Sequence, residues 1–189
     1  MDNSDFRYLR ESSVSEDEIN NPTREQLDAV VDGQHLRVNE ELYRVEGRSH
    51  IVETNKKFTK TKSYTESTIN LRSITKTGDY VFLSYGVDDN LEIFLSGERM
   101  SLSDIGVEAS GVGDITCIQS GGKQYFLDDN WRGIYTSPAG KKNAVSIYEF
   151  VSGETGLTIE GYCDMDSVDD FSYEAYSWRE VRGKDLSIC

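Results

Sequence analysis

The residues of this chain with the clearest capacity for chemistry are carboxylates in a short segment near the C-terminus. They are Asp164, Asp166, Asp169 and Asp170. Hard cations such as calcium prefer clustered carboxylate oxygens, so a metal site in the loop 164–170 is one prediction. The loop lacks the glycine turn and final glutamate of a helix-loop-helix calcium site. A solvated acidic turn is the other prediction, and Asp88-Asp89 in a similar earlier segment favours the turn.

Aromatic side chains with polar tips form a second candidate site. They are Trp131, Tyr148, Tyr162, Tyr173, Tyr176 and Trp178. Tyrosine and tryptophan combine a large contact area with a hydrogen-bonding group, which suits recognition surfaces. We therefore expect these side chains to line a concave binding face. The alternative is that they fill the space between two sheets.

Cysteine and histidine offer no recognisable catalytic or metal-binding pattern. His35 and His50 are the only histidines, and each stands without a carboxylate or cysteine at ligand spacing. Cys117, Cys163 and Cys189 fit neither a zinc knuckle nor a redox pair. A nucleophile needs a base and an orienting group within hydrogen-bond reach, and no motif supplies them. We expect free thiols, no catalytic residues and no cofactor.

The net charge of the chain limits the classes of molecule that it can bind. It has 34 acidic and 20 basic residues among 189, a net charge of −14. Nucleic acids need clustered basic residues, so no nucleic-acid binding is expected. The one basic cluster, Lys56–Lys62, reads as a solvated hairpin loop. The acidity itself has three interpretations: solubility, adaptation to a salt-rich cell, or an acidic face for a basic protein partner.

Hydropathy gives no sign of a membrane protein. No apolar run approaches the length of a membrane span, and the start of the chain has no secretory pattern. We therefore predict a cytoplasmic protein without a membrane span.

Alternating apolar and polar residues predict antiparallel strands in the C-terminal part of the chain. Residues 146–151, 157–162 and 171–176 show this period-two pattern between Gly-, Asp- and Ser-rich turns. The segment 71–105 resembles 147–181 in the order of its strands and turns, which suggests a two-fold internal repeat. The predicted fold is mainly β. Two antiparallel meanders would pack as a sandwich or a partly open barrel, with apolar side chains pointing inward.

The remaining segments set the predicted boundaries. Residues 1–20 read as an acidic tail, and 21–33 as one short N-terminal helix with Asn21 as its cap and Pro22 in its first turn. The first β half covers 34–114 and the second 115–182, in a single compact domain over 21–182. Residues 183–189 read as a C-terminal tail.

Several strand and turn motifs resemble the prokaryotic family named domain of unknown function 4178. They are Tyr43–Arg48, Gly122–Leu127, Gly156–Tyr162 and Tyr173–Tyr176, within a resemblance that covers roughly 33–181. The resemblance implies an all-β domain. It implies no catalytic residues, because none are established for that family.

The function predicted from the sequence is that of a non-enzymatic β domain with an acidic surface, which binds an unknown protein partner or acts as a scaffold. The alternative is a small metal- or sugar-binding β protein, including a hydrolytic one, that uses the loop 164–170. A third reading, a membrane-associated stress protein, has no anchor in the sequence. Nothing in the sequence indicates the oligomeric state.

Overall fold

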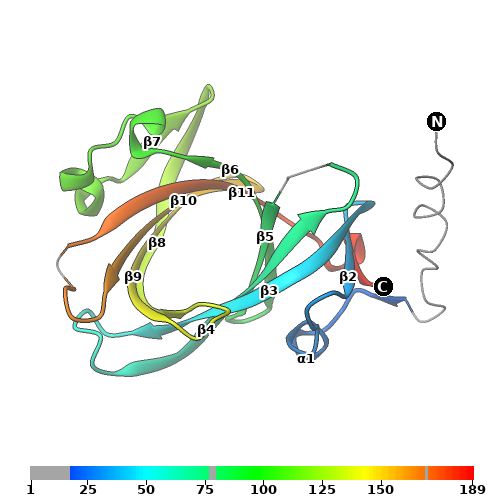
Figure 1. Ribbon diagram of the computed structural model, residues 1–189. Coiled ribbons are helices and arrows are strands. Elements are labelled where there is room, and N and C mark those ends of the chain that lie inside the picture. Colours follow the sequence, from blue (N-terminus) through cyan, green and yellow to red (C-terminus); the bar gives the residue numbers. More distant parts are fainter. Residues whose placement is uncertain (1–17, 77–79, 169) are drawn as a thin grey trace, which may run out of the picture.

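The computed structural model describes residues 18–76, 80–168 and 170–189, and its body is a closed antiparallel barrel of eight strands, seen nearly end on in Figure 1. The barrel order is β3-β4-β5-β6-β11-β10-β9-β8, and β8 pairs with β3 to close the ring. The strands are β3 (Glu41–Thr54), β4 (Thr61–Ser73), β5 (Tyr80–Val87), β6 (Leu91–Met100), β8 (Lys123–Thr136), β9 (Lys142–Ser152), β10 (Thr155–Asp164) and β11 (Ser172–Glu180). The mainly β class is confirmed, but the barrel is closed rather than a sandwich or a partly open barrel.

The barrel is made of two consecutive four-stranded meanders, β3 to β6 and β8 to β11. Their first strands pair with each other through Ile51 and Tyr135, and their last strands pair through Ser96 and Trp178. These two seams join residues that are distant in the sequence. They leave no free edge within the barrel, which removes the usual template for edge-to-edge association.

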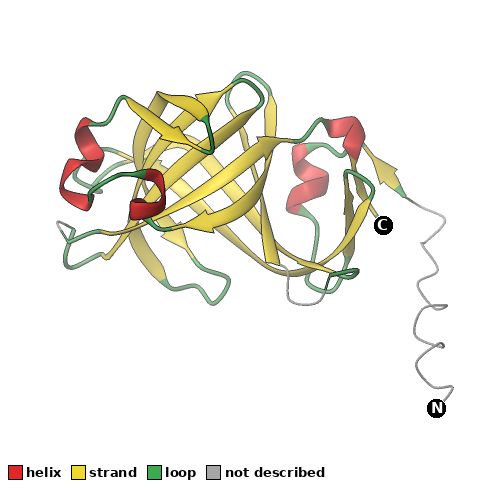
Figure 2. Cartoon of the chain, turned by 90° about the horizontal axis from the view of Figure 1, so that it is seen from above, coloured by secondary structure: helices red, strands yellow, loops and turns green. Residues whose placement is uncertain are grey.

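Shorter elements cover two outer sides of the barrel, as Figure 2 shows from above. On one side lie β1 (Ile19–Asn20), α1 (Arg24–Asp28), β2 (His35–Val38), η3 (Gly183–Asp185) and β12 (Leu186–Ile188). On the other lie the 3-10 helices η1 (Leu102–Ile105) and η2 (Ala109–Asp114), with β7 (Cys117–Ser120). Within residues 183–189, which were expected as a tail, Gly183–Asp185 forms η3 and Leu186–Ile188 pairs with β2, with Leu186 and Ile188 buried. Residues 1–17 of the predicted N-terminal tail lie outside the described residues, whereas Ile19 and Asn20 pair with β12.

Helix α1 is capped by Thr23 and not by Asn21. The Thr23 hydroxyl accepts a hydrogen bond from the Gln26 backbone N–H, and the Gln26 side chain accepts one from the Thr23 N–H at 2.8 Å. This reciprocal capping box satisfies two of the free N–H groups at the helix start. Asn21 has a φ of 53°, a left-handed conformation that a helix N-cap does not adopt.

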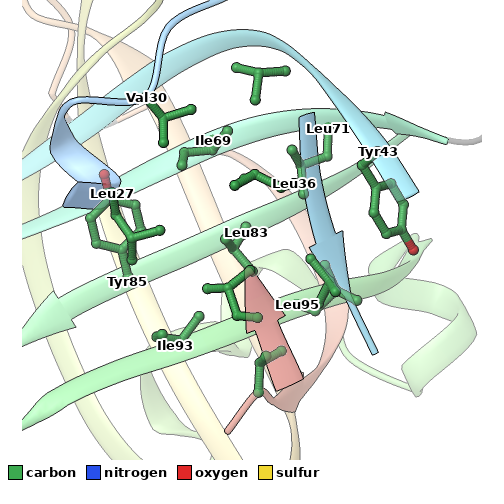
Figure 3. Packing of buried hydrophobic residues seen from close by; sticks show 14 of the residues in the cluster. Leu27, Val30, Leu36, Tyr43, Ile69, Leu71, Leu83, Tyr85, Ile93 and Leu95 are labelled. Carbon is green, nitrogen blue, oxygen red and sulfur yellow. The ribbon is translucent and has the colours of Figure 1, made fainter. Parts of the chain in front are cut away.

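Most of the apolar core lies outside the barrel wall, and a smaller cluster of Ile51, Trp131, Val145 and Ile147 lies on the inner face. Figure 3 shows its larger part, where Leu27 of α1 and Leu36 of β2 pack on Ile69, Leu83 and other side chains of the barrel strands. A second cluster joins the 3-10 helices to the wall on the other side, through Ile105, Val112, Phe150, Leu157 and Ile159. Because side chains alternate across each strand, the opposite set of residues faces the lumen.

Candidate ligand-binding site in the barrel lumen

The barrel encloses a cavity of about 570 Å³, lined by residues from all eight strands. This volume lies in the range of small-molecule sites, which is roughly 300–1,000 Å³. An eight-stranded barrel either fills its interior with side chains or holds one small ligand there. The cavity places this barrel in the second group.

Carboxylates are the only charged side chains that line the cavity. They are Glu66, Glu92, Asp128, Glu149, Glu154, Glu160 and Glu180. No lysine, arginine or histidine of the described chain is among the lining residues. Glu66, Glu149 and Glu160 lie partly buried within the lumen and are called the inner carboxylates. The other four are exposed and are called the rim carboxylates.

The inner carboxylates project from three different strands, β4, β9 and β10. Each has a neutral hydrogen-bond donor: the Ser84 hydroxyl for Glu66, the Trp131 side chain for Glu149 and the Tyr162 hydroxyl for Glu160. The Tyr162–Glu160 hydrogen bond measures 2.6 Å. Within the described part of the chain, none of the three carboxylates forms an ion pair. When these carboxylates ionise, they therefore have no counter-charge.

Enclosure makes the charged form of these groups costly. Burial raises the pKa of Glu66 to about 8, and the nearby charges of Glu149 and Glu160 act in the same direction. Burial likewise raises the pKa of Glu149 to about 7, against the opposing hydrogen bond from Trp131. Burial also raises the pKa of Glu160. A positive charge placed in the lumen would reverse these shifts, because it favours the ionised carboxylates.

Besides polar and aliphatic side chains such as Thr68 and Ile147, the wall contains aromatic rings. They are Tyr64, Phe82, Phe94, Tyr135, Tyr162, Tyr176 and Trp178. Trp178 packs against Phe94 with ring centroids 4.7 Å apart, and Phe82 meets Tyr176 edge to face at 6.3 Å. The Trp178 ring also lies directly over Gly156, where a Cβ atom would come within 2.0 Å of it. Glycine at this position therefore makes room for the ring.

The structure brings together three of the six aromatic residues predicted as a binding face. Tyr162, Tyr176 and Trp178 line the lumen. Trp131 is buried beside them, in a cluster with Ile51, Val145 and Ile147. Tyr148 and Tyr173 lie on the other face of their strands and pack on the second outer core.

The predicted metal loop is a surface turn between β10 and β11. Asp164, Asp166 and Asp170 are exposed, and Asp169 lies outside the described residues. Asp164 accepts a hydrogen bond from Asn143 at 3.3 Å and pairs with Lys141 at 3.4 Å. Among the residues that the structure describes, no group of three or more His, Cys, Asp or Glu side chains could hold a metal ion. Cys117, Cys163 and Cys189 form no disulfide bond in the described chain.

Sequence reasoning missed Glu66 and Glu149 as site residues. A signal exists in the alternation of side chains along β4. One face of this strand carries Tyr64, Glu66, Thr68 and Asn70, and the other carries the buried Ile69. A strand that is apolar on one face and mixes carboxylates with aromatic residues on the other fits a polar lumen as well as a solvated surface. The closure of the barrel decides between them.

Comparisons with known proteins give no relative. A scan against models of protein families and searches of curated proteins and solved structures found no significant match. The resemblance to domain of unknown function 4178 stays a prediction. Among the described residues, no helix has the length and apolar character that crossing a membrane requires.

Proposed function

We propose that this protein is a binding protein that holds a small organic molecule inside its barrel. The observation that carries the proposal is the cavity of about 570 Å³ with enclosed, unpaired carboxylates at the place where most folds have an apolar core. Empty volume and buried charge both destabilise a folded chain. A binding role accounts for both costs, since functional sites commonly reduce stability.

The protein-partner role expected from the sequence relied on an aromatic face. Tyr162, Tyr176 and Trp178 line the cavity, where a small molecule can reach them more readily than a protein surface can. We therefore favour a small ligand over a protein partner. We also keep the cytoplasm as the proposed location.

We further propose that the two meanders derive from an internal duplication. The pairing of first strand with first strand and last with last supports it, as does the extra strand that precedes each half, β2 before β3 and β7 before β8.

A thermal-shift screen tests the proposed binding role. A small-molecule library that spans amines, carboxylates, sugars and neutral apolar compounds is added to the wild type and to Thr158→Phe, which fills the lumen. Thr75→Phe, at an exposed site outside the lumen, is the matched control. A ligand that binds only the folded state raises the melting temperature by mass action. We expect at least one class to stabilise the wild type and the control by several degrees and to leave Thr158→Phe unchanged.

The proposal fails if no class raises the melting temperature, or if the rise persists when the lumen is filled. Should Thr158→Phe not fold, Ser96→Phe fills the lumen from β6 and serves in its place.

A further inference from the structure

We infer that the ligand of the lumen is an elongated organic dication of the linear diamine class, with one ammonium group at each end of the cavity. This inference rests on the proposed binding role and names the chemistry of the ligand. It follows from three features of the wall: its charge, the spread of its carboxylates, and the position of its aromatic rings.

The charge of the wall selects a cation. Seven carboxylates line the cavity, and no basic side chain of the described chain lines it. Of the seven, Glu154 alone pairs with a cationic side chain among the described residues, Arg182 at 3.0 Å, at the rim. Interactions between charges are much stronger in an enclosed site than in bulk water, so an anionic ligand would be strongly repelled. A neutral ligand would leave the inner carboxylates without a counter-charge. A cation satisfies them directly.

The spread of the carboxylates favours an organic cation over a metal ion. Glu66, Glu149 and Glu160 lie on separate strands, and no group in the described residues has the convergent ligands that a metal ion needs. Aromatic faces such as those of Trp178 and Tyr176 attract organic ammonium groups and also accept methylene chains. The wall therefore offers contacts for both parts of an alkyl ammonium ion.

The register of β10 with β11 indicates two cationic ends. Tyr176 pairs with Thr158, and Trp178 pairs with Gly156, so the two rings occupy the middle of this part of the wall. Beyond Tyr176 lies Glu160, which pairs with Glu174.

Beyond Trp178 lies the opposite carboxylate end, formed by Glu180, whose N–H donates to the Glu154 carbonyl at 3.1 Å. The Glu154 carboxylate itself pairs with Arg182. Glu174, the partner of Glu160, is six residues from Glu180 on β11, which corresponds to roughly 20 Å of extended strand before side-chain reach is subtracted. Carboxylates thus stand at both ends of an aromatic track. A diamine with an aliphatic chain of several carbons matches this order.

Isothermal titration calorimetry near pH 8 tests the inference with four six-carbon probes: hexane-1,6-diamine, hexylamine, hexane-1,6-diol and adipate. We expect the diamine to bind most tightly and hexylamine to bind at least roughly tenfold more weakly, because it reaches only one carboxylate end. The diol and adipate should give no binding heat. Equal or tighter binding of the diol or adipate would overturn the inference.

Neutral variants locate the two ends. Glu160→Gln and Glu180→Gln should each reduce diamine affinity towards that of hexylamine, while Glu108→Gln, an exposed glutamate outside the lumen, should leave it unchanged. A diamine affinity that survives both substitutions also contradicts the inference. If the thermal-shift screen yields a ligand of another class that a filled lumen abolishes, the diamine assignment fails while the binding role stands. If no class binds, both fail.

Discussion

The two faces of the barrel wall differ in what they contribute. On β5, Leu83 points outward and is fully buried under the covering segments, whereas its neighbour Ser84 points into the cavity. On β10, Leu157 and Ile159 enter the second outer core, while Thr158 and Glu160 face the lumen. The outer face is apolar and packs against the covering segments. The inner face surrounds a cavity and combines carboxylates and hydroxyls with aromatic rings and with apolar side chains such as Ile51 and Ile147.

Within a single strand, the outward side chains therefore contribute to stability and the inward side chains to the proposed ligand binding. Covering segments such as α1, β2 and β12 supply the apolar burial that most folds place in their centre. The barrel can then keep an open interior without losing its main source of stability. Substitutions on the two faces should consequently have effects of different size and kind.

The largest effect is expected from Leu83→Ala on the outer face. Truncation of a fully buried leucine leaves a cavity, and the free energy of unfolding should fall by about 2–5 kcal/mol in urea denaturation. Ser84→Ala, one residue away on the inner face, should change it by less. Diamine affinity of the folded Leu83→Ala protein should stay at the wild-type value; a loss would mean that the two faces are not separable.

A smaller effect is expected from Gly156→Ala, which acts on the lumen through packing. The new Cβ would lie 2.0 Å from the Trp178 ring and 2.6 Å from the Phe150 carbonyl oxygen, so the ring must shift. Overpacking of this kind costs about 1–3 kcal/mol. In a Trp131→Phe background, Trp178 is the only tryptophan, and its emission should change together with a loss of diamine binding.

Gly111→Ala is the control for this experiment, because a Cβ there meets nothing within 4 Å. If Gly156→Ala left both the emission and the affinity unchanged, Trp178 would not be part of the site.

The last expected effect is a pH dependence of stability. Burial raises the pKa of Glu66 from 4.5 to about 8, so between these values the folded state holds a proton that the unfolded state has released. Stability should therefore fall as pH rises through this window, and Glu149 adds to the effect up to its pKa of about 7. The melting temperature of the empty protein should be lower by a few degrees near pH 8.5 than near pH 5.5.

The charged and titratable groups that act on this pair are Asp128, Asp129, Glu160 and Tyr64. Glu92 and, from outside the wall, Arg24 act on Tyr64 in turn. Glu66→Gln removes one titrating group and should reduce the slope, which distinguishes the lumen from the general repulsion of an acidic chain. A melting temperature that rises between these two pH values would contradict the assignment.

Much of the fold was predictable from local patterns, whereas the site was not. The strands predicted at 146–151, 157–162 and 171–176 correspond to β9, β10 and β11, because alternation and turn residues act over short distances. The closure of β3 against β8 joins residues far apart in the sequence, such as Val52 and Ile134, and no local signal reports it.

The alternation of apolar and polar side chains along each strand was visible in the sequence. Which of the two sets faces the centre of the molecule was not. Apolar residues were expected to point to the centre of the molecule, yet Leu157 and Phe150 point outward because separate segments cover the barrel. The same error hid Glu66 and Glu149, which alternation alone would place on a solvated face. Tyr162 and Tyr148 show the consequence: both are β-strand tyrosines, and only the one with inward parity reaches the cavity.

The most direct test of the central claim, that the lumen is a site for a cation and not a core, uses the double variant Glu66→Gln/Glu149→Gln. Its melting temperature is measured near pH 8 with and without hexane-1,6-diamine, beside the wild type. Removal of two enclosed charges should raise the melting temperature of the empty protein above that of the wild type, and the diamine should raise it further by less than it raises that of the wild type. A lower melting temperature without ligand, or an undiminished rise with the diamine, would contradict the claim.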